Sequence, residues 1–567
     1  MKRLPAFGTA VLVTLVAAAT VPSGALATGG PTGVATATST AKQATTLKWD
    51  FRMPASVHSN RDDRIAGDDP LKPIKGYPEA DNVRWGPLPK KGRFDVTLTA
   101  CSSTTDGAAK YRWQVTDAGI TTKWSKSCDT TVRLTEGKHT VTAQLRDKSG
   151  TSSSTGRITV RNTLLVITGD SYSSGVGFPT LDGGSSPWLN AAGDNYNWDD
   201  PVCLRTRWGG FLRSAVALEQ ADPRSNVTVI DVACGGGQVT KPGGLLYPQN
   251  NGTGYRPAQI DQINSIIGKR RIDLLQLSIG GNDTGFGTVI TTCATLFLVD
   301  PTADCWDAPV SKSKGMGVPH DKALSRVVRA VPLSPDDRAN LLGGGSAPTL
   351  NTTIQHNLST LPGRFSDLHR CFDGTGCKTF KLKGDEPAGR ATASRALTIK
   401  PDNVLQMVYP NLIRNQDGNL CSDPTLAAPL NLADSQWAER GVIHFAKAKG
   451  KKSIKVGDQT VPWGPDGINT RLGLNGRQFG WTIDAGVYHD TDHNGLCSTE
   501  PAIYPLDAAL NPFPQYHGTV PSFKWGVVHP NTLGQGIYAE HLTKASSRLV
   551  GHPVGKPKVR HSQHGLG

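Results

Sequence analysis

A serine in a turn of small residues is the first candidate for chemistry. Ser171 follows the apolar run Leu164–Ile167 and lies in the stretch 169–175, which reads Gly-Asp-Ser-Tyr-Ser-Ser-Gly. Four consecutive apolar residues indicate a buried parallel strand. A turn just past such a strand lies at the carboxyl edge of the sheet, where open α/β folds keep their sites. Gly-Asp-Ser also occurs in ordinary turns, so the assignment of a nucleophile depends on the rest of the chain.

Three other places carry residues suited to the same chemistry. A triple glycine, 235–237, follows the apolar stretch 227–232, and Gly-Gly-Asn-Asp, 280–283, follows the stretch 273–278. His529 precedes the last helical segment of the chain. A lone histidine is more often structural than catalytic, and glycine loops are common, so the combination and its order carry the inference.

Acyl transfer requires these groups. A serine hydroxyl is a weak nucleophile until a base removes its proton, and His529 can do this near neutral pH. The oxyanion of the tetrahedral intermediate needs donors fixed in advance. We expect the backbone N–H groups of Ser171 and Gly236 and the side-chain amide of Asn282 to supply them, since glycine at 236 permits close approach.

These ordered segments resemble the four sequence blocks of the SGNH hydrolases, also called GDSL esterases and lipases. The resemblance covers about 163–550, with 306–400 poorly matched. It implies a parallel, flavodoxin-like α/β domain with Ser171 as nucleophile and His529 as base. It also implies that Gly236 and Asn282 complete the oxyanion hole.

The chain departs from that family at the position three residues before the histidine. The family usually has Asp there, whereas this chain has Gly526. We therefore predict a Ser–His dyad in which the carbonyl of Gly526, or that of Trp525, accepts the hydrogen bond of His529 Nδ1. Asp170 is expected to stabilise the turn and not to act as the catalytic acid, because it adjoins the serine.

Ten cysteines allow complete pairing. The cysteine order is similar to that of secreted actinobacterial SGNH enzymes, which implies the pairs Cys203–Cys234, Cys293–Cys305 and Cys421–Cys497. The simplest local connectivity adds Cys101–Cys128 and Cys371–Cys377, although order alone does not prove it. Zinc is disfavoured because no close cysteine pair stands opposite another Cys or His pair.

The stretch 490–495 resembles the start of a calcium loop, with Asp490 and Asp492 at positions one and three. Position twelve is Pro501, where an EF-hand requires Glu, and Glu500 falls one residue early. A polar loop beside Cys497 is the favoured interpretation, so we expect neither a metal nor a cofactor.

The N-terminus indicates export. Lys2 and Arg3 precede an apolar run, and Ala25-Leu26-Ala27 forms a small-x-small cleavage site, so residues 1–27 are predicted to be a signal peptide. Its removal lowers the formal charge from +14 to +12. No later stretch contains enough consecutive apolar residues, about 18 or more, to predict a membrane span. The expected location is extracellular, and cysteine-rich composition fits an oxidising compartment.

Four parts are predicted after the signal peptide. Residues 28–85 form a linker and an unassigned stretch, 86–161 a β-sandwich, 162–550 the hydrolase domain with an insertion at 306–400, and 551–567 a basic tail. Alternating apolar residues at 94–160, divided by turns, indicate an antiparallel sandwich that resembles small immunoglobulin-like modules. Its expected role is that of a spacer, with surface or glycan contact as the alternative.

Strands alternate with helices from 162 onward, which indicates an α/β fold with a parallel sheet. Strands are expected at 164–168, 227–232, 273–278 and 404–409. Helices are expected at 208–218, 257–267, 435–448 and 533–549, with two short helical stretches inside 306–400.

The sequence therefore predicts a secreted serine esterase that hydrolyses carboxylic esters, most naturally lipid esters. One alternative is a carbohydrate acetyl esterase acting on polysaccharide. Another is a non-catalytic protein that binds glycan or cell wall on the same scaffold. The basic charge suits anionic surfaces, whereas no nucleic-acid motif is present, so nucleic acid is not an expected partner.

Overall fold

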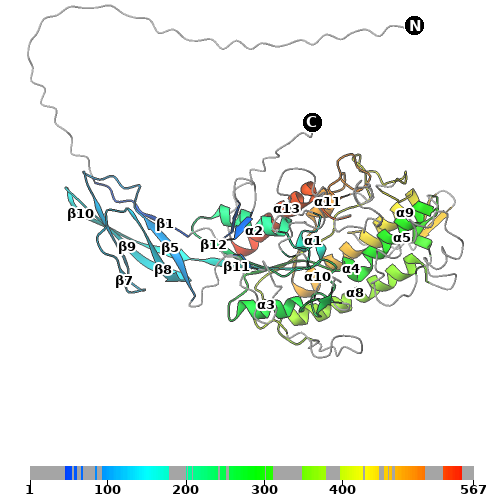
Figure 1. The fold of residues 1–567 in the computed structure, drawn as a ribbon, viewed down its shortest axis with the longest axis horizontal. Helices are drawn as coiled ribbons and strands as arrows, with labels where there is room; N and C mark the ends of the chain where they lie inside the picture. Colours follow the sequence, from blue (N-terminus) through cyan, green and yellow to red (C-terminus); the bar gives the residue numbers. More distant parts are fainter. Residues whose placement is uncertain are drawn as a thin grey trace, which may run out of the picture. The chain divides into compact units, whose positions relative to one another are not determined.

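A computed structural model gives the architecture (Figure 1). The predicted signal peptide, most of the predicted linker and nearly all of the predicted basic tail lie outside the described residues. The structure describes residues 45–53, 57–59, 65–67, 84–85, 92–177, 200, 202–206, 209–239, 243–250, 255–299, 302–308, 310, 348–377, 396–425, 428–445, 453–456, 459–462, 467–504 and 528–551.

Two antiparallel sheets form the predicted β-sandwich. One has the order β1-β5-β8, and the other has the order β10-β9-β6-β7. Their inward side chains, among them Val96, Trp113, Leu134 and Leu145, form a hydrophobic core of their own. The strands are β1 (Asp50–Arg52), β5 (Arg93–Thr99), β6 (Lys110–Val115), β7 (Ile120–Thr121), β8 (Asp129–Thr135), β9 (Gly137–Asp147) and β10 (Gly150–Val160).

The sandwich begins earlier than predicted. Strand β1 lies in the stretch that the sequence left unassigned, yet Phe51 pairs with Leu98 of β5. The same stretch also supplies β4 (Arg84–Trp85), which pairs with β12 (Asn226–Asp231) in the sheet of the second domain. It also supplies the hairpin of β2 (Val57–Ser59) and β3 (Ile65–Gly67). Three-residue strands without clear alternation are too short to recognise by periodicity.

The second domain is an α/β fold built on a six-stranded sheet. Its order is β19-β16-β15-β11-β12-β4, in which β4 is antiparallel and the other five strands are parallel. The parallel strands are β11 (Asn162–Gly169), β12 (Asn226–Asp231), β15 (Leu274–Ser278), β16 (Val404–Met407) and β19 (Thr482–Asp484). The four predicted strands are confirmed, and β19 was missed.

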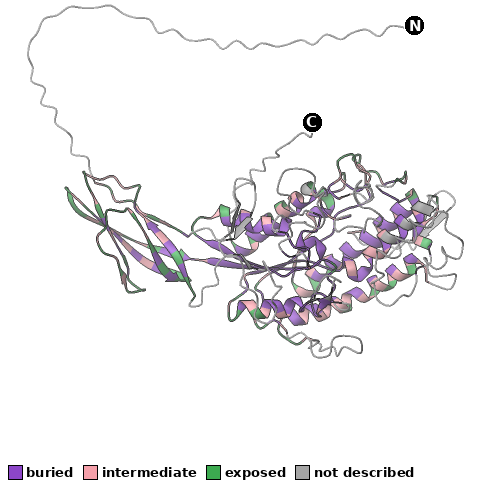
Figure 2. Cartoon of the chain, in the orientation of Figure 1, coloured by how far each residue is buried: buried purple, intermediate pink, exposed green. Residues whose placement is uncertain are grey.

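Strand order reverses at β11, because the chain goes first to β12 on one side and then to β15 on the other. In open α/β sheets the crevice at such a switch point, outside the carboxyl ends of the strands, is where ligands bind. Figure 2 shows these strands buried, and every residue of β11, β12 and β15 is buried, as both faces of a parallel sheet require.

Helices cover both faces of the sheet. Gln276 of β15 donates hydrogen bonds to Ser214 of α2 and Ser546 of α13, so these helices share one face, and α3 lies on the other (Figure 1). The described α-helices are α1 (Ser171–Ser174), α2 (Gly210–Ala221), α3 (Gln259–Ile267), α4 (Gly281–Thr284), α5 (Phe286–Val299), α8 (Leu350–Phe372), α9 (Leu432–Trp437), α10 (Ile468–Phe479), α11 (Gly486–Asp490) and α13 (Thr532–Val550). Other elements are β13 (Gln249–Asn250), β14 (Tyr255–Arg256), β17 (Ser453–Val456), β18 (Gln459–Pro462), the 3-10 turn Cys305–Asp307 and the π-helical turn Ala438–Ile443.

One helix prediction is corrected. The predicted helix 435–448 is instead α9 continued by a π-helical turn, and it ends at Ile443. The prediction of two short helical stretches within 306–400 falls largely outside the described residues, and the described part of that segment contains one 23-residue helix, α8. Its Leu358, Leu361 and Phe365 are buried in the main core, so this part of the insertion belongs to the domain interior.

All five predicted disulfides are present, and no cysteine is free. A histidine between two carboxylates adds a further link near the C-terminus. His541 of α13 lies between Asp484 and Asp490, with N···O distances of 3.2 and 2.7 Å. Hydrogen bonds to these carboxylates raise the pKa of His541 to about 9, against the opposing effect of burial. We call these three residues the His541 clamp, which joins α13 to the edge of the sheet.

Candidate active site

The structure brings Ser171 and His529 together. Nε2 of His529 lies 2.7 Å from Oγ of Ser171, across 358 residues of sequence. Ser171 begins α1 directly after β11, and only 9 % of it is exposed. His529 lies just before α13, whose N-cap is Asn531. This hydrogen bond is within the range that proton transfer requires.

Steric crowding requires a glycine at position 169, two residues before Ser171. Gly169 has a φ of 127°, and a Cβ there would lie 2.1 Å from the carbonyl oxygen of Ser278. The backbone of β11 therefore approaches the end of β15 more closely than a side chain permits. Gln259 of α3 holds the same residue, since its amide bonds both the N–H and the carbonyl of Gly169 at 2.7 Å.

Asp170 links the serine turn to the Asn282 loop. Its Oδ1 accepts from the N–H of Tyr172 at 3.0 Å, which caps α1 and confirms the predicted role of this residue in the turn. Its Oδ2 accepts from the hydroxyl of Tyr409, which in turn accepts from the N–H of Gly281 at 2.8 Å. Burial raises the pKa of Asp170 to about 7, although the hydrogen bond from Tyr409 opposes the rise.

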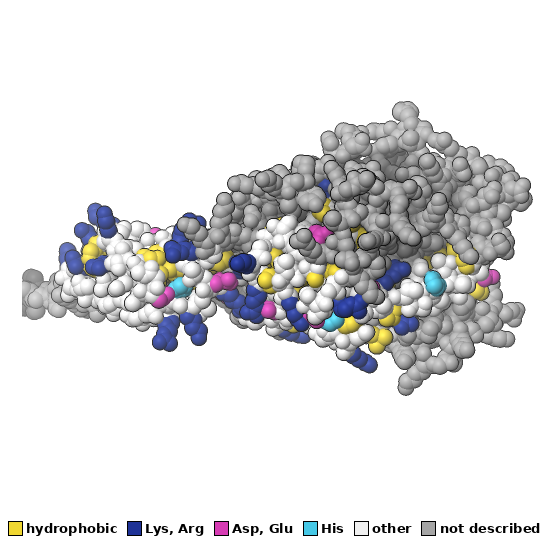
Figure 3. Space-filling model, turned by 90° about the horizontal axis from the view of Figure 1, so that it is seen from below, with side chains coloured by type: hydrophobic (Ala, Val, Ile, Leu, Met, Phe, Trp, Pro, Cys, Tyr) yellow, Lys and Arg dark blue, Asp and Glu magenta, His cyan; other side chains and the backbone are white. Residues whose placement is uncertain are grey.

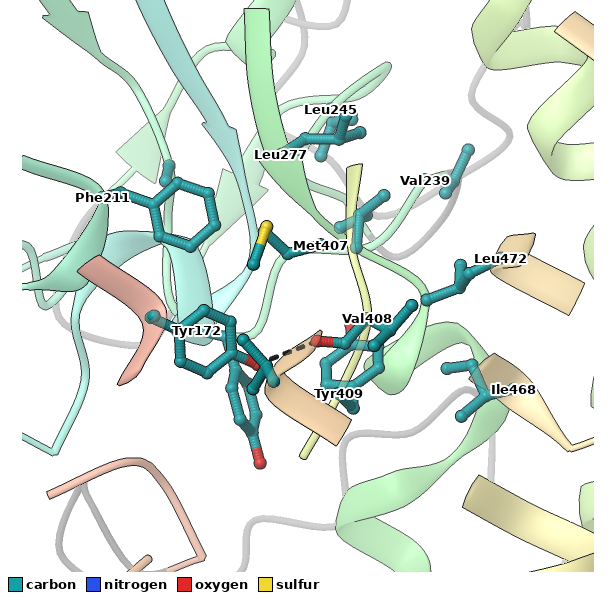
Figure 4. Close-up of a cluster of buried hydrophobic side chains, with 14 of the residues drawn as sticks. Tyr172, Phe211, Val239, Leu245, Leu277, Met407, Val408, Tyr409, Ile468 and Leu472 are labelled. Atoms are coloured by element: carbon teal, nitrogen blue, oxygen red, sulfur yellow. Dashed lines mark hydrogen bonds between the residues drawn. The ribbon is translucent and has the colours of Figure 1, made fainter. Parts of the chain in front are cut away.

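Tyr172 links the serine turn to the histidine. Its hydroxyl donates to the carbonyl of Val528 at 2.8 Å, and its ring centroid lies 5.2 Å from that of His529. Tyr172 and Tyr409 pack edge to face at 5.0 Å within the main core (Figure 4). The residues on both sides of the serine therefore reach the Asn282 loop and the histidine segment.

The histidine segment contains a strained residue. Val528 has a φ of 61°, in the left-handed region that β-branched residues avoid. Its N–H donates to the carbonyl of Tyr504 at 2.9 Å, and the N–H of Tyr504 donates to the carbonyl of His529 at 3.0 Å. Such strain persists only where surrounding contacts determine the conformation, and here these bonds and the Tyr172 hydroxyl supply them.

Gly236 occupies the tip of a tight turn. The N–H of Gly237 donates to the carbonyl of Cys234 at 2.9 Å, and Gly236 has a φ of 75°. This is the third position of a turn that favours glycine. Gly236 is exposed, whereas its neighbours Gly235 and Gly237 are buried. We call residues 233–237 the glycine turn.

Asn282 is fixed against the glycine turn. Its side-chain amide donates to the carbonyl of Gly237 at 2.9 Å, and Gln238 donates to the Asn282 carbonyl at 3.2 Å. Gly236 follows β12, Ser171 follows β11 and Asn282 follows β15. The predicted oxyanion-hole residues thus come from three adjacent strands at one edge of the sheet.

A buried ionic cluster contacts the start of the glycine turn. Asp200 accepts from Arg205 at 2.5 Å and from Arg256 at 2.9 Å, and Asp200 and Arg205 are fully buried. Arg205 donates to the carbonyl of Ala233 at 3.2 Å, while the Cys203–Cys234 disulfide ties the same segments covalently. Nearby arginines lower the pKa of Asp200 against the opposing effect of burial.

Helix α8 reaches the same site. Arg364 donates to Oδ1 of Asp283 at 2.9 Å, and Asp283 also accepts from the N–H of Val239 at 2.9 Å. Asn357 donates to the carbonyl of Thr284 at 3.0 Å. The poorly matched segment therefore contributes directly to the position of the Asn282 loop.

An apolar pocket lies beyond the Asn282 loop. Phe286, Val289 and Ile290 of α5 line it together with Leu412 and Ile413, which follow β16. Phe286 is four residues from Asn282, and Leu412 is three residues from Tyr409. The walls of the pocket are therefore continuous in sequence with two residues of the site.

The carboxylates of the suspected calcium loop have protein partners. Asp490 belongs to the His541 clamp, and Asp492 accepts from Asn411 at 2.8 Å. Across the described part of the chain, no group of three or more His, Cys, Asp or Glu residues is arranged to hold a metal ion. Gly526 and Trp525, one of whose carbonyls was predicted to accept the hydrogen bond of His529 Nδ1, lie outside the described residues.

Sequence reasoning named the four candidate positions Ser171, Gly236, Asn282 and His529 but missed the residues that hold them. Tyr409 was visible only as the end of a predicted strand, and Gln259 only as part of a helix. Arg364 lay in a segment without an assigned role. Their partners are more than 80 residues away in every case, so local patterns give no signal for them.

No protein-family model and no curated protein sequence matches the chain.

Proposed function

We propose that the chain is a secreted serine esterase of the SGNH type that hydrolyses carboxylic esters, with lipid esters as the substrate class. The observation that carries the proposal is the 2.7 Å contact between Ser171 Oγ and His529 Nε2 at the carboxyl edge of the sheet. Gly236 and Asn282 lie at the ends of the neighbouring strands, where oxyanion donors are needed.

The reaction follows from these positions. His529 Nε2 takes the proton of Ser171, and Oγ attacks the ester carbonyl carbon to give a tetrahedral oxyanion. The N–H groups of Ser171 and Gly236 and the amide of Asn282 stabilise that oxyanion. Protonated His529 then donates its proton to the leaving alkoxide, and water hydrolyses the acyl-enzyme with the same residue as base. The carbonyl of Gly526 or of Trp525 orients the imidazole.

The strand order supports the family proposal. Numbered along the chain, the five parallel strands lie in the order 2-1-3-4-5, which is the flavodoxin-like arrangement. The ordered blocks around Ser171, Gly236, Asn282 and His529 fall at the carboxyl end of this sheet, as the SGNH resemblance implies. The sandwich is an immunoglobulin-like module.

The preference for lipid esters comes from the sequence resemblance to secreted SGNH enzymes and from the insertion near the site. The apolar pocket lined by α5 and by the segment after β16 is too small for an acyl chain, so it does not distinguish a lipid from an acetylated sugar. Five disulfides are typical of proteins in an oxidising compartment. In the described part of the chain no helix is long and apolar enough to cross a membrane, and the N-terminal signal accounts for export.

Labelling with a fluorophosphonate tests the nucleophile. The wild-type protein is expected to be labelled and Ser171→Ala is not, while Ser174→Ala, a buried serine on the same short helix, retains labelling. Hydrolysis of p-nitrophenyl esters of increasing chain length then tests the substrate class. An unlabelled wild-type protein contradicts the esterase proposal, and release of acetate from glycan without long-chain hydrolysis contradicts only the lipid assignment.

A further inference from the structure

The two sheets of the sandwich differ sharply in the charge of their outer faces. Side chains alternate along a strand, and buried Tyr111, Trp113, Val141 and Leu145 define the inner face of the β10-β9-β6-β7 sheet. Every charged side chain at an outward position of β6, β9 and β10 is basic: Lys110, Arg112, Lys138, Arg146 and Arg157. The other outward positions on these strands hold Thr, Ser or Gln. We call this surface the basic face.

The opposite sheet has no such excess. Its outward charged positions are Asp50 and Arg52 of β1, Arg93 and Asp95 of β5, and Asp129 and Arg133 of β8. Arg133 forms an ion pair with Asp95 at 3.1 Å. The outward charges of β1, β5 and β8 therefore balance, and the basic face is a property of one sheet and not of the whole module. Lys and Arg side chains project from the sandwich in Figure 3.

A tryptophan lies among the cations of the basic face. The guanidinium carbon of Arg146 is 4.4 Å from the ring centroid of Trp124, and that of Arg112 is 6.0 Å away. Trp124 is only partly buried, and the adjacent Lys123 is exposed. Tryptophan with arginine and lysine is the combination that meets the headgroup layer of a bilayer.

The carboxylates at the ends of this sheet do not neutralise the face. Asp117 accepts from the ring of His139 at 2.5 Å and from the N–H of Thr140 at 2.8 Å. Asp147 accepts from the hydroxyl of Thr45 at 2.6 Å and from the N–H of Asp106 at 2.9 Å. Both carboxylates bond groups in turns, and among the described residues neither forms an ion pair with a basic side chain of this face, so these cations are available to an external anion.

We propose that the basic face binds a lipid surface rich in anionic phospholipid headgroups. The basic face is the outer surface of a four-stranded sheet. Its cations and hydroxyls are therefore spread over an extended surface, which matches the layer of phosphates at a bilayer surface. Each basic residue near an anionic membrane strengthens binding about fivefold. Binding is expected to weaken with salt, because exposed charges are screened.

Two matched triple variants test the assignment in the full chain, on a Ser171→Ala background so that ester hydrolysis cannot alter the vesicles. Arg112→Gln/Arg146→Gln/Arg157→Gln removes three charges from the basic face. Arg52→Gln/Arg93→Gln/Arg133→Gln removes three from the opposite sheet and leaves the same net charge. The measurement is sedimentation with vesicles of phosphatidylcholine, with or without phosphatidylglycerol, as a function of salt.

The unsubstituted surface is expected to bind only the phosphatidylglycerol vesicles. The first triple variant should lose more than about tenfold in affinity, and the second less than about threefold. In a separate arm, the fluorescence shift on binding should decrease when Trp124→Phe is introduced. Circular dichroism confirms that each variant is folded.

Three results would overturn the proposal. Equal losses in the two triple variants would show that only total charge matters. Absence of binding to either vesicle would remove the lipid surface as a partner. Binding to a soluble phosphodiester polymer without binding to vesicles would assign the face to a polymer instead. None of these outcomes bears on the esterase proposal, because the assay requires no turnover.

Discussion

Removing the hydroxyl of Tyr172 should impair catalysis through His529. The hydroxyl donates to the carbonyl of Val528 at 2.8 Å, and Tyr172 and Val528 are 2 % and 1 % exposed. Tyr172→Phe leaves that carbonyl buried without this donor, which costs about 1–3 kcal/mol of stability. Because Val528 is already held in a left-handed conformation, losing the donor should let the adjacent histidine move.

The expected effect on the reaction follows from the same energy. If about 2 kcal/mol of positioning is lost in the transition state, kcat falls about thirtyfold. KM should change little, because Tyr172 is buried and does not face the substrate. The assay is steady-state hydrolysis of a p-nitrophenyl ester, alongside urea unfolding of the same preparations.

Tyr538 provides a matched control. It is 1 % exposed, and its hydroxyl donates to the carbonyl of Val408 at 3.0 Å. Tyr538→Phe therefore breaks the same kind of buried bond, but its acceptor does not belong to the histidine segment. We expect similar losses of stability in the two variants and a large loss of kcat only in Tyr172→Phe. Equal kcat values for the two variants would refute a positioning role for Tyr172.

Three further outcomes are expected. The pKa of His541 in the folded protein, about 9, exceeds its ordinary 6.5, so the His541 clamp stabilises the fold fully below pH 6.5 and this contribution is lost as pH rises through 9. In urea unfolding across this window, the wild type should lose about 2 kcal/mol more stability than His541→Gln, a figure reduced for partial solvent screening, and parallel stability curves would contradict the clamp. Replacing Cys203 and Cys234 by serine should lower stability by about 3–4 kcal/mol and should also lower kcat, whereas replacing Cys101 and Cys128 of the sandwich should leave kcat unchanged. Equal kcat values in the two double variants would show that the glycine turn needs no covalent support. Gly169→Ala should prevent folding or destabilise by more than about 4 kcal/mol, whereas Gly480→Ala should cost about 1–2 kcal/mol, because Gly480 is left-handed with a φ of 72° and has open space around the new Cβ. Comparable soluble yields and unfolding midpoints would count against the steric explanation.

Much of the scaffold could be predicted from the sequence. The apolar runs at 164–168, 227–232, 273–278 and 404–409 became strands because a strand buried on both faces needs consecutive apolar residues. The sandwich followed from alternation, since one face of each sheet is solvated. Strand β19 escaped because its three residues, Thr482–Asp484, are too few and too polar for either pattern.

The candidate site divides in the same way. Ser171, Gly236, Asn282 and His529 could be chosen because their residue types and their places after strands point to one chemistry. The sequence also suggested how the ten cysteines pair, because neighbouring cysteines in a loop-rich chain can reach one another. These inferences use only residue types and their positions along the chain, which do not depend on how the distant segments pack.

Only the tertiary structure decided what holds those residues in place. Tyr409 meets Asp170 across 239 residues, Tyr172 meets Val528 across 356, and Arg364 meets Asp283 across 81. Each contact depends on packing between elements whose approach is set by the whole core. A hydroxyl or guanidinium in the sequence has many available partners, and the fold selects one of them by distance and burial.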